Sequence, residues 1–226
     1  MRKFAISSIL KKLIMSISGL FLIIFLLIHL GANLVAVFSA DAYNTVCHFM
    51  DTNILIRIMV PVLALGFVIH IAYALVLTLQ NMKARGNDKY GCGTKTDIKW
   101  ASQNMFVLGL IIFGFLALHL IHFWAKMQLQ TFLAMAGIDS NPAESPYMLV
   151  VDLFTNPVYV AVYLVWIAAL WFHLTHGFWS AFQTIGLSNS NWAPRIKCIG
   201  TIYAWVVALG FAFIPVYFLL MGCCAN

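Results

Sequence analysis

The sequence predicts an all-α polytopic membrane protein with five transmembrane helices. Of its 226 residues, 63% are hydrophobic and only 9% are charged, whereas a soluble domain carries about 25% charged residues. Five long apolar runs alternate with polar segments, and Lys and Arg are concentrated in every second segment. A soluble core cannot bury this much apolar surface, so the lipid bilayer must be the solvent for most of the chain.

Each apolar run is long enough to cross the bilayer, since about 20 helical residues span roughly 30 Å of hydrocarbon. The connecting segment 125–156 contains the run Asp-Ser-Asn-Pro, which breaks the helical pattern. We expect this segment to be an external loop with one short interfacial helix. We expect a single membrane domain over residues 1–226, with spans at approximately 13–38, 55–81, 103–125, 157–183 and 199–221.

The distribution of basic residues predicts the orientation of the bundle. On one side lie Arg57 and Lys126, together with five acidic residues, Asp41, Asp51, Asp139, Glu144 and Asp152. Cytoplasmic segments are enriched in Lys and Arg, so the N-terminus is expected in the cytoplasm, the C-terminus outside, and the protein in the inner (cytoplasmic) membrane. The other eleven basic residues lie on the cytoplasmic side: Arg2, Lys3, Lys11, Lys12, Lys83, Arg85, Lys89, Lys95, Lys99, Arg195 and Lys197.

Histidine is the ionisable residue type that the sequence places deep in the membrane. The central portions of the five runs contain no Asp, Glu, Lys or Arg, which argues against an ion pump or a proton-coupled transporter, because these need intramembrane carboxylates or a comparable relay. A single histidine in a span is commonly hydrogen-bonded between helices. When four spans each carry at least one histidine, a ligand that the histidines share is the better explanation. The six histidines in the runs are His29, His70, His119, His122, His173 and His176.

Their depths sort four of these histidines into two pairs. At 1.5 Å per residue, His29 and His119 reach the outer half of the membrane, and His70 and His173 reach the inner half. Each pair takes one residue from each of two helices. Haem iron binds one axial ligand above and one below the ring, so the pattern predicts two bis-imidazole b haems in a haem-binding bundle. The chain contains no C-x-x-C-H motif, so attachment would be non-covalent.

Two further histidines accompany the ligands that we predict. His122 follows His119 by three residues, and His176 follows His173 in the same way, so each couple shares a helix face. Both second histidines lie one turn closer to the membrane surface. We therefore predict His29 and His119 as ligands of an outer haem and His70 and His173 as ligands of an inner haem. His122 and His176 are left as partners of haem propionates or quinone, or as interfacial residues.

The ordered set of histidine motifs resembles the cytochrome b membrane subunit of succinate:quinone oxidoreductases, meaning succinate dehydrogenase and fumarate reductase. The resemblance is to the version with one membrane polypeptide, five spans and two haems, and it covers most of the chain from the first span through the fourth. The segments that carry it are 25–30 (FLLIHL), 47–51 (CHFMD), 69–73 (IHIAY), 118–124 (LHLIHFW) and 172–180 (FHLTHGFWS).

The resemblance implies more than the spacing does. It implies a flavoprotein subunit with FAD and an iron–sulfur subunit on the cytoplasmic side, and electron transfer between them and a membrane quinone (menaquinone or ubiquinone) through the two haems. It also implies that ligands pair between the first and third spans and between the second and fourth. That pairing agrees with the depths of the histidines.

Candidate residues for quinone chemistry lie at the outer ends of the first two spans. Quinone reduction takes two electrons and two protons, so it needs an acid or base beside a largely apolar pocket. Asp51 and His48 are the catalytic candidates, and solvated loop residues are the plain alternative. Arg57 and Lys126 are candidates for balancing the outer haem propionates, or for contact with lipid headgroups.

Three other functions remain open from the sequence. A dihaem cytochrome b of a hydrogenase or formate dehydrogenase would share the bis-histidine helices but attach to different partners. A haem-free membrane anchor for a peripheral enzyme would need only the spans. A metal transporter with histidine-lined helices is disfavoured, because no carboxylates accompany the histidines in the apolar runs.

Overall fold

The computed structural model describes residues 7–85, 100–187 and 189–225, which form nine α-helices and one short 3-10 helix. Five helical segments are long and apolar enough to cross a membrane. The prediction of an all-α, multi-pass membrane protein with five spans is therefore confirmed, while the orientation of its ends stays a prediction. The five helices are α1 (Ser8–Phe38), α3 (Ile54–Arg85), α5 (Met105–His122), α8 (Pro157–Thr184) and α9 (Trp192–Ala225).

Capping side chains, rather than hydrophobicity, set where α1 and α9 begin. The Ser7 hydroxyl accepts from the backbone N–H of Leu10 at 3.2 Å, so α1 begins before the apolar run does. The Asn189 side chain likewise accepts from the N–H of Trp192 at 2.9 Å and starts α9 early. Such caps satisfy N–H groups that the first helical turn leaves without partners. The real helices therefore extend beyond several of the predicted spans.

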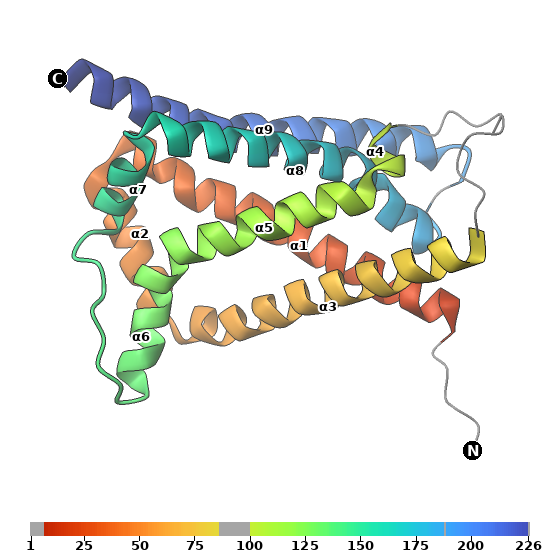
Figure 1. Cartoon of the computed structure of the whole chain (residues 1–226), viewed down its shortest axis with the longest axis horizontal. Helices are drawn as coiled ribbons and strands as arrows, with labels where there is room; N and C mark the ends of the chain where they lie inside the picture. Colours follow the sequence, from red (N-terminus) through yellow and green to blue (C-terminus); the bar gives the residue numbers. More distant parts are fainter. Residues whose placement is uncertain (1–6, 86–99, 188, 226) are drawn as a thin grey trace.

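Four short helical segments gather at one end of the molecule (Figure 1). The prediction of one short helix in 125–156 is wrong, because this segment contains α6 and α7, joined to α5 through η1. The first and second spans are also connected by a helix, α2, whose N-terminus is capped by Ser39. Serine caps and a proline at the first turn start α2 and α7. The segments are α2 (Ala40–Thr52), η1 (Trp124–Lys126), α6 (Gln128–Met135) and α7 (Pro146–Phe154).

At the opposite end, a single helical turn, α4 (Trp100–Gln103), precedes α5 (Figure 1). The first long helix begins at this end and α9 finishes at the other, as an odd number of spans requires. Several basic residues that the sequence singled out lie outside the described residues: Arg2, Lys3, Lys89, Lys95 and Lys99.

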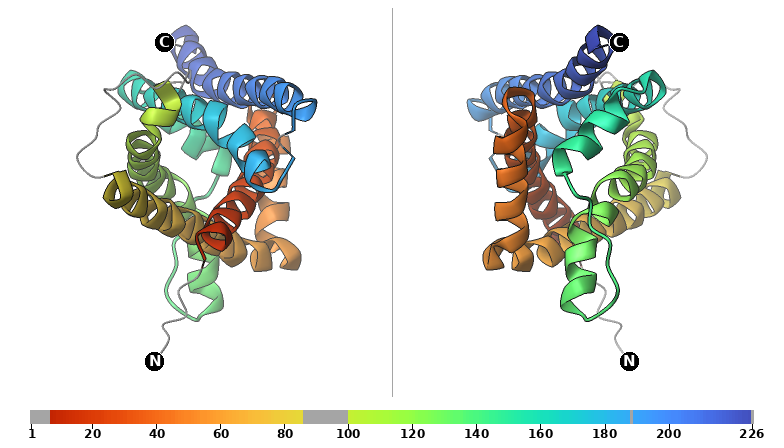
Figure 2. Two further views of the ribbon diagram at one scale, coloured as in Figure 1. Left: turned by 90° about the vertical axis from the view of Figure 1, so that its right-hand side faces the viewer. Right: turned by 90° about the vertical axis from the view of Figure 1, so that its left-hand side faces the viewer.

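Viewed along their axes, α1, α3, α5 and α8 form a four-sided ring (Figure 2). Neighbouring helices around the ring contact one another in the order α1–α3–α5–α8–α1, and the contact between α3 and α5 is the sparsest of the four. The fifth long helix, α9, packs outside the ring against α8 and α1. Consequently α1 and α5 occupy opposite corners, and so do α3 and α8.

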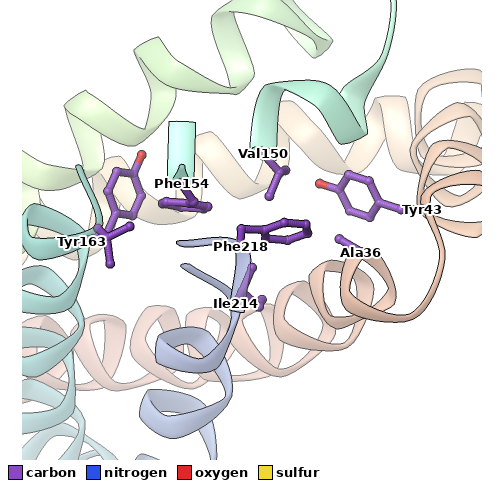
Figure 3. Close-up of a cluster of buried hydrophobic side chains, with 8 residues drawn as sticks. Ala36, Tyr43, Val150, Phe154, Tyr163, Ile214 and Phe218 are labelled. Carbon is purple, nitrogen blue, oxygen red and sulfur yellow. The ribbon is translucent and has the colours of Figure 1, made fainter. Parts of the chain in front are cut away.

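Apolar packing is concentrated away from the centre of this ring. One cluster joins α2, α7, α8 and α9 around Tyr43, Phe154 and Phe218 (Figure 3). Another lies between α8 and α9, where Ala204 and Val207 are fully buried. By contrast, α3 has no buried residue in its described part. Apolar side chains from the other helices therefore do not enclose α3.

Candidate functional site

The outer histidine pair joins two opposite corners of the ring. The imidazole of His29 on α1 and that of His119 on α5 have ring centres 5.8 Å apart, and their planes cross at 89°. Both side chains are half-buried. Folding thus brings together the two histidines that the sequence placed in the outer half of the membrane.

The inner pair joins the other two corners. The ring centres of His70 on α3 and His173 on α8 lie 6.4 Å apart, with an interplanar angle of 64°. The Ser18 hydroxyl contacts His70, and Ser18 and His29 lie about three turns apart on α1, which is roughly 16 Å along the helix. The two imidazole pairs therefore occupy two levels of one bundle.

The spacing of both pairs fits two imidazoles on opposite sides of one metal ion. A metal–imidazole bond is about 2 Å long, and the nitrogen lies about 1 Å from the ring centre, so two axial ligands place their ring centres roughly 6 Å apart. In addition, the Nδ1 atoms of His119 and His173 are buried without a hydrogen-bond partner. Buried polar atoms normally have partners, so a ring nitrogen of each histidine is left for a bound group; Nε1 of Trp166 and of Trp171 is buried without a partner in the same way.

Small residues leave room beside the inner imidazoles. A Cβ atom at Gly19 would lie 3.4 Å from Cε1 of His70, and one at Gly177 would lie 3.9 Å from Cδ2 of His173. Larger side chains at these positions would press against the rings. Gly66 has a different role, because it accommodates the ring of Phe21 in the contact between α1 and α3. The donor set and the space around it thus fit a haem.

The tautomer of His70 follows from its hydrogen bond. The Ser18 hydroxyl donates its single hydrogen to the backbone oxygen of Met15 at 3.0 Å. Its oxygen lies 3.3 Å from Nδ1 of His70 and accepts from the N–H at that position. The lone pair of His70 is then on Nε2, the nitrogen that remains for a metal. Ligating histidines commonly donate their other N–H in this way.

A second network fixes His29 to the outer end of the bundle. The Asn33 amide donates to the backbone oxygen of His29 at 2.8 Å and lies 3.3 Å from Nδ1 of its ring. The Tyr43 hydroxyl on α2 donates to Oδ1 of Asn33 at 3.3 Å. Burial raises the pKa of Tyr43 above its ordinary value, so this donor keeps its proton. The network connects the position of α2 to that of His29.

His122 and His176 have partners other than histidine. Nδ1 of His122 lies 3.0 Å from the Tyr163 hydroxyl, and the two rings stack with an interplanar angle of 21°. The His176 ring meets the Trp179 ring edge-on at 5.1 Å. The first histidine of each couple therefore faces the opposite corner of the ring, whereas the second one packs against an aromatic side chain.

Asp51, a predicted quinone residue, bridges α2 and α6. Its Oδ1 accepts from the Thr131 hydroxyl at 2.6 Å and from the Gln128 amide at 3.1 Å. The Arg57 guanidinium donates to the backbone oxygen of Asp51 at 2.6 Å. Asp51 is half-buried. These contacts hold the carboxylate in one position at the end of the bundle that carries α2 and α6.

The other outer candidates are placed differently. His48 is exposed on α2, one turn before Asp51, and its backbone oxygen accepts from Thr52. Lys126 is exposed in η1, where its backbone oxygen accepts from the N–H of Ala143. The structure therefore separates a held carboxylate at Asp51 from an exposed imidazole at His48.

Sequence reasoning missed the residues that hold the candidate site residues, namely Ser18, Asn33, Tyr43 and Tyr163 around the histidines and Gln128 and Thr131 around Asp51. A signal was present for the first two. Asn33 follows His29 by one helical turn, and Ser18 lies on the same face of α1 three turns earlier. The remaining four contact their partners only through tertiary folding, so no local spacing reveals them.

Comparison with known proteins supports the resemblance. The chain is similar to the succinate dehydrogenase cytochrome b558 subunit of Bacillus subtilis (strain 168), with 23% identity over 184 residues. The alignment covers 81% of this chain and 82% of that protein. No protein-family model matches the chain, and no solved structure matches it. The resemblance predicted from the histidine motifs, to the cytochrome b membrane subunit of succinate:quinone oxidoreductases, is thus confirmed.

Proposed function

We propose that this protein is the dihaem cytochrome b membrane subunit of a succinate dehydrogenase or fumarate reductase. In this role it transfers electrons between iron–sulfur and flavin subunits and a membrane quinone. The observation that carries the proposal is the presence of two cross-ring imidazole pairs at two levels, with ring centres 5.8 Å and 6.4 Å apart. The comparison supports the cytochrome b assignment.

His29 and His119 would hold the outer haem, and His70 and His173 the inner haem. When bound with two imidazole ligands, a b haem supplies one-electron transfer rather than oxygen binding. The protein's part is to fix the rings. Ser18 sets the tautomer of His70, and Asn33 holds the turn of α1 that carries His29. Tyr163 engages His122 and holds that side chain apart from the His29–His119 pair.

The partner subunits are proposed to bind at the end of the bundle that carries α4, which is the cytoplasmic side on the charge distribution. Two of the basic side chains described at this end are held over aromatic rings: the Lys197 ammonium lies 5.0 Å from the Trp179 ring centre, and the Arg195 guanidinium lies 5.3 Å from that of Trp192. Such cation–π contacts hold positive charge at the surface. A partner with an acidic docking face would complement it.

The quinone is proposed to react at the outer end, where Asp51 exchanges its protons. Both hydrogen bonds from described side chains to this carboxylate end on Oδ1, which leaves Oδ2 for a proton or a quinone oxygen. Thr131 and Gln128 orient the group, as a general acid–base residue requires. His48, exposed on the same helix, is the second candidate and would exchange protons with the outer solution.

The decisive experiment is haem quantitation on the purified complex. We expect two b haems per polypeptide by pyridine haemochrome assay, and both should be reduced by succinate in membranes that contain the partner subunits. A stoichiometry of one or none would reject the two-haem proposal. Reduction by hydrogen or formate, but not by succinate, would instead assign the chain to a hydrogenase or formate dehydrogenase.

A further inference from the structure

A cleft of about 530 Å³ opens between α1, α3 and α8, near the start of α1 and the end of α8. None of the functional residues discussed above lines it. Its wall is amphipathic, with apolar side chains interrupted by one cation and four neutral polar groups. The residues that matter for its chemistry are Lys12, Ser16, Leu77, Ser180, Gln183 and Thr184.

The cleft lies directly below the inner imidazole pair. Leu77 follows His70 on α3, and Ser180 follows His173 on α8, each by two helical turns. Seven residues bring a helix back to nearly the same face, so both walls continue the faces that carry the imidazoles. On α1, Met15 lines the cleft, and its backbone oxygen accepts from the hydroxyl of Ser18, which contacts His70. The cleft therefore lies next to the inner pair, below the faces of α3 and α8 that carry His70 and His173.

The donors in the cleft suit a carboxylate. Lys12 offers an ammonium group, and although the residue is exposed overall, its stem can follow the cleft wall as lysine stems do at membrane interfaces. Ser16 is buried, with 6% of its surface exposed, and Gln183 adds an amide N–H₂. The Thr184 hydroxyl already donates to the Ser180 backbone oxygen at 3.1 Å, so it does not add a donor.

We propose that this cleft receives the propionate carboxylates of the inner haem, with Lys12 as their counter-ion and Ser16 and Gln183 as hydrogen-bond donors. The inference rests on the proposed function, because it requires a macrocycle between His70 and His173. Propionates are the charged groups of a b haem and lie on one edge of the ring. Burying them without a cation would be costly, and the cleft supplies one on the side nearest to water.

The test compares three variants of the full complex by redox titration of each haem. Lys12→Met removes the cation, Lys12→Arg keeps it, and Lys11→Met removes the adjacent charge, which does not line the cleft. A nearby cation favours the reduced haem, which carries one more electron. We expect Lys12→Met to lower the midpoint potential of the inner haem, or to reduce its occupancy, while the outer haem remains unchanged. Lys12→Arg and Lys11→Met should both resemble the wild type.

Several results would overturn the inference. One is that Lys12→Met leaves the potential and content of both haems unaltered. Another is that Lys11→Met has the same effect, since the change in the inner haem would then come from the general surface charge and not from the cleft. A third is that added anionic lipid restores the Lys12→Met variant, since the cleft would then hold a lipid headgroup. The failure of the proposed function is distinguishable from all of these, because in that case the wild-type complex would itself contain no inner haem.

Discussion

The imidazole rings of His29 and His119 lie 5.8 Å apart across the centre of the bundle, with their planes nearly perpendicular at 89°. Their helices, α1 and α5, are not neighbours around the ring of four. His70 and His173 stand in the same relation on the other diagonal. A ligand held between each pair would therefore connect helices that direct packing leaves apart.

Single substitutions of the paired histidines should each remove one specific haem. We expect His29→Ala and His119→Ala to lose the outer haem, and His70→Ala and His173→Ala to lose the inner haem. An axial ligand cannot be replaced by a methyl group. Haem quantitation with low-temperature spectra would measure the loss and identify which of the two signals remains.

The second histidine of each couple provides the matched control. His122→Ala and His176→Ala should retain both haems, because these rings contact Tyr163 and Trp179 instead of the opposite imidazole. If His122→Ala lost a haem while His119→Ala kept both, the ligand on α5 would be misassigned.

Enlarging Gly19 should displace the inner haem selectively. A Cβ at this position already approaches His70 to 3.4 Å, so the γ-methyl groups of Gly19→Val would push the imidazole out of line. We expect the inner haem content to fall by at least half while the outer haem is retained. Gly31→Val is the control on the same helix, since a Cβ there meets nothing within 4 Å. Equal losses in both variants would indicate general disruption of α1.

Removing the Asp51 carboxylate should separate quinone chemistry from haem binding. In proteoliposomes with the partner subunits, we expect Asp51→Asn to lower quinone-linked succinate oxidation by about 100-fold, the usual scale for losing a general acid–base group. Both haem spectra, and succinate oxidation with an artificial acceptor, should persist. Asp41→Asn, an exposed acid on the same helix, should behave as wild type. Full quinone activity in Asp51→Asn would remove this residue from the mechanism.

Thiol labelling would test the orientation of the bundle. A membrane-impermeant maleimide applied to intact cells should label the exposed pair Cys223 and Cys224 and leave the exposed Cys198 unlabelled until the membrane is opened. Cys47 should label slowly at neutral pH, since burial raises the pKa of its thiol and the thiolate is the nucleophile. Its labelling rate should therefore keep rising towards alkaline pH. Labelling of Cys198 first would invert the topology.

The sequence predicts the spans well because bilayer thickness and hydrophobicity determine them. It misses helix ends such as those at Ser8 and Trp192, since side-chain caps decide these. It also misses the helical fold of the outer segments, where packing around Phe154 and Phe218 stabilises short helices with weak patterns of their own. Similarly, the shared face of α1 singles out Ser18, but its partner His70 is identifiable only once α1 and α3 are placed side by side.

The histidine couples also show which features the sequence predicts and which ones only the structure supplies. Depth arguments sort His29 with His119 and His70 with His173, because rise per residue is fixed in a helix. The choice of His119 over His122 as the haem ligand on α5 also depends on depth. The contact of His122 with Tyr163 adds a physical reason that residue spacing does not supply. The ligand assignment itself stays a prediction until haem loss is measured in the variants.

The exposed character of α3 has a consequence for biogenesis. This helix has no buried residue in its described part and meets α5 only sparsely. On the two-haem proposal, the macrocycles supply the packing that α3 lacks on the side of α5, and a ligand that binds only the folded state stabilises it by mass action. A cell short of iron or porphyrin would then hold chains whose α3 is attached mainly through α1, open to membrane proteases. The abundance of the subunit would follow the supply of its cofactor.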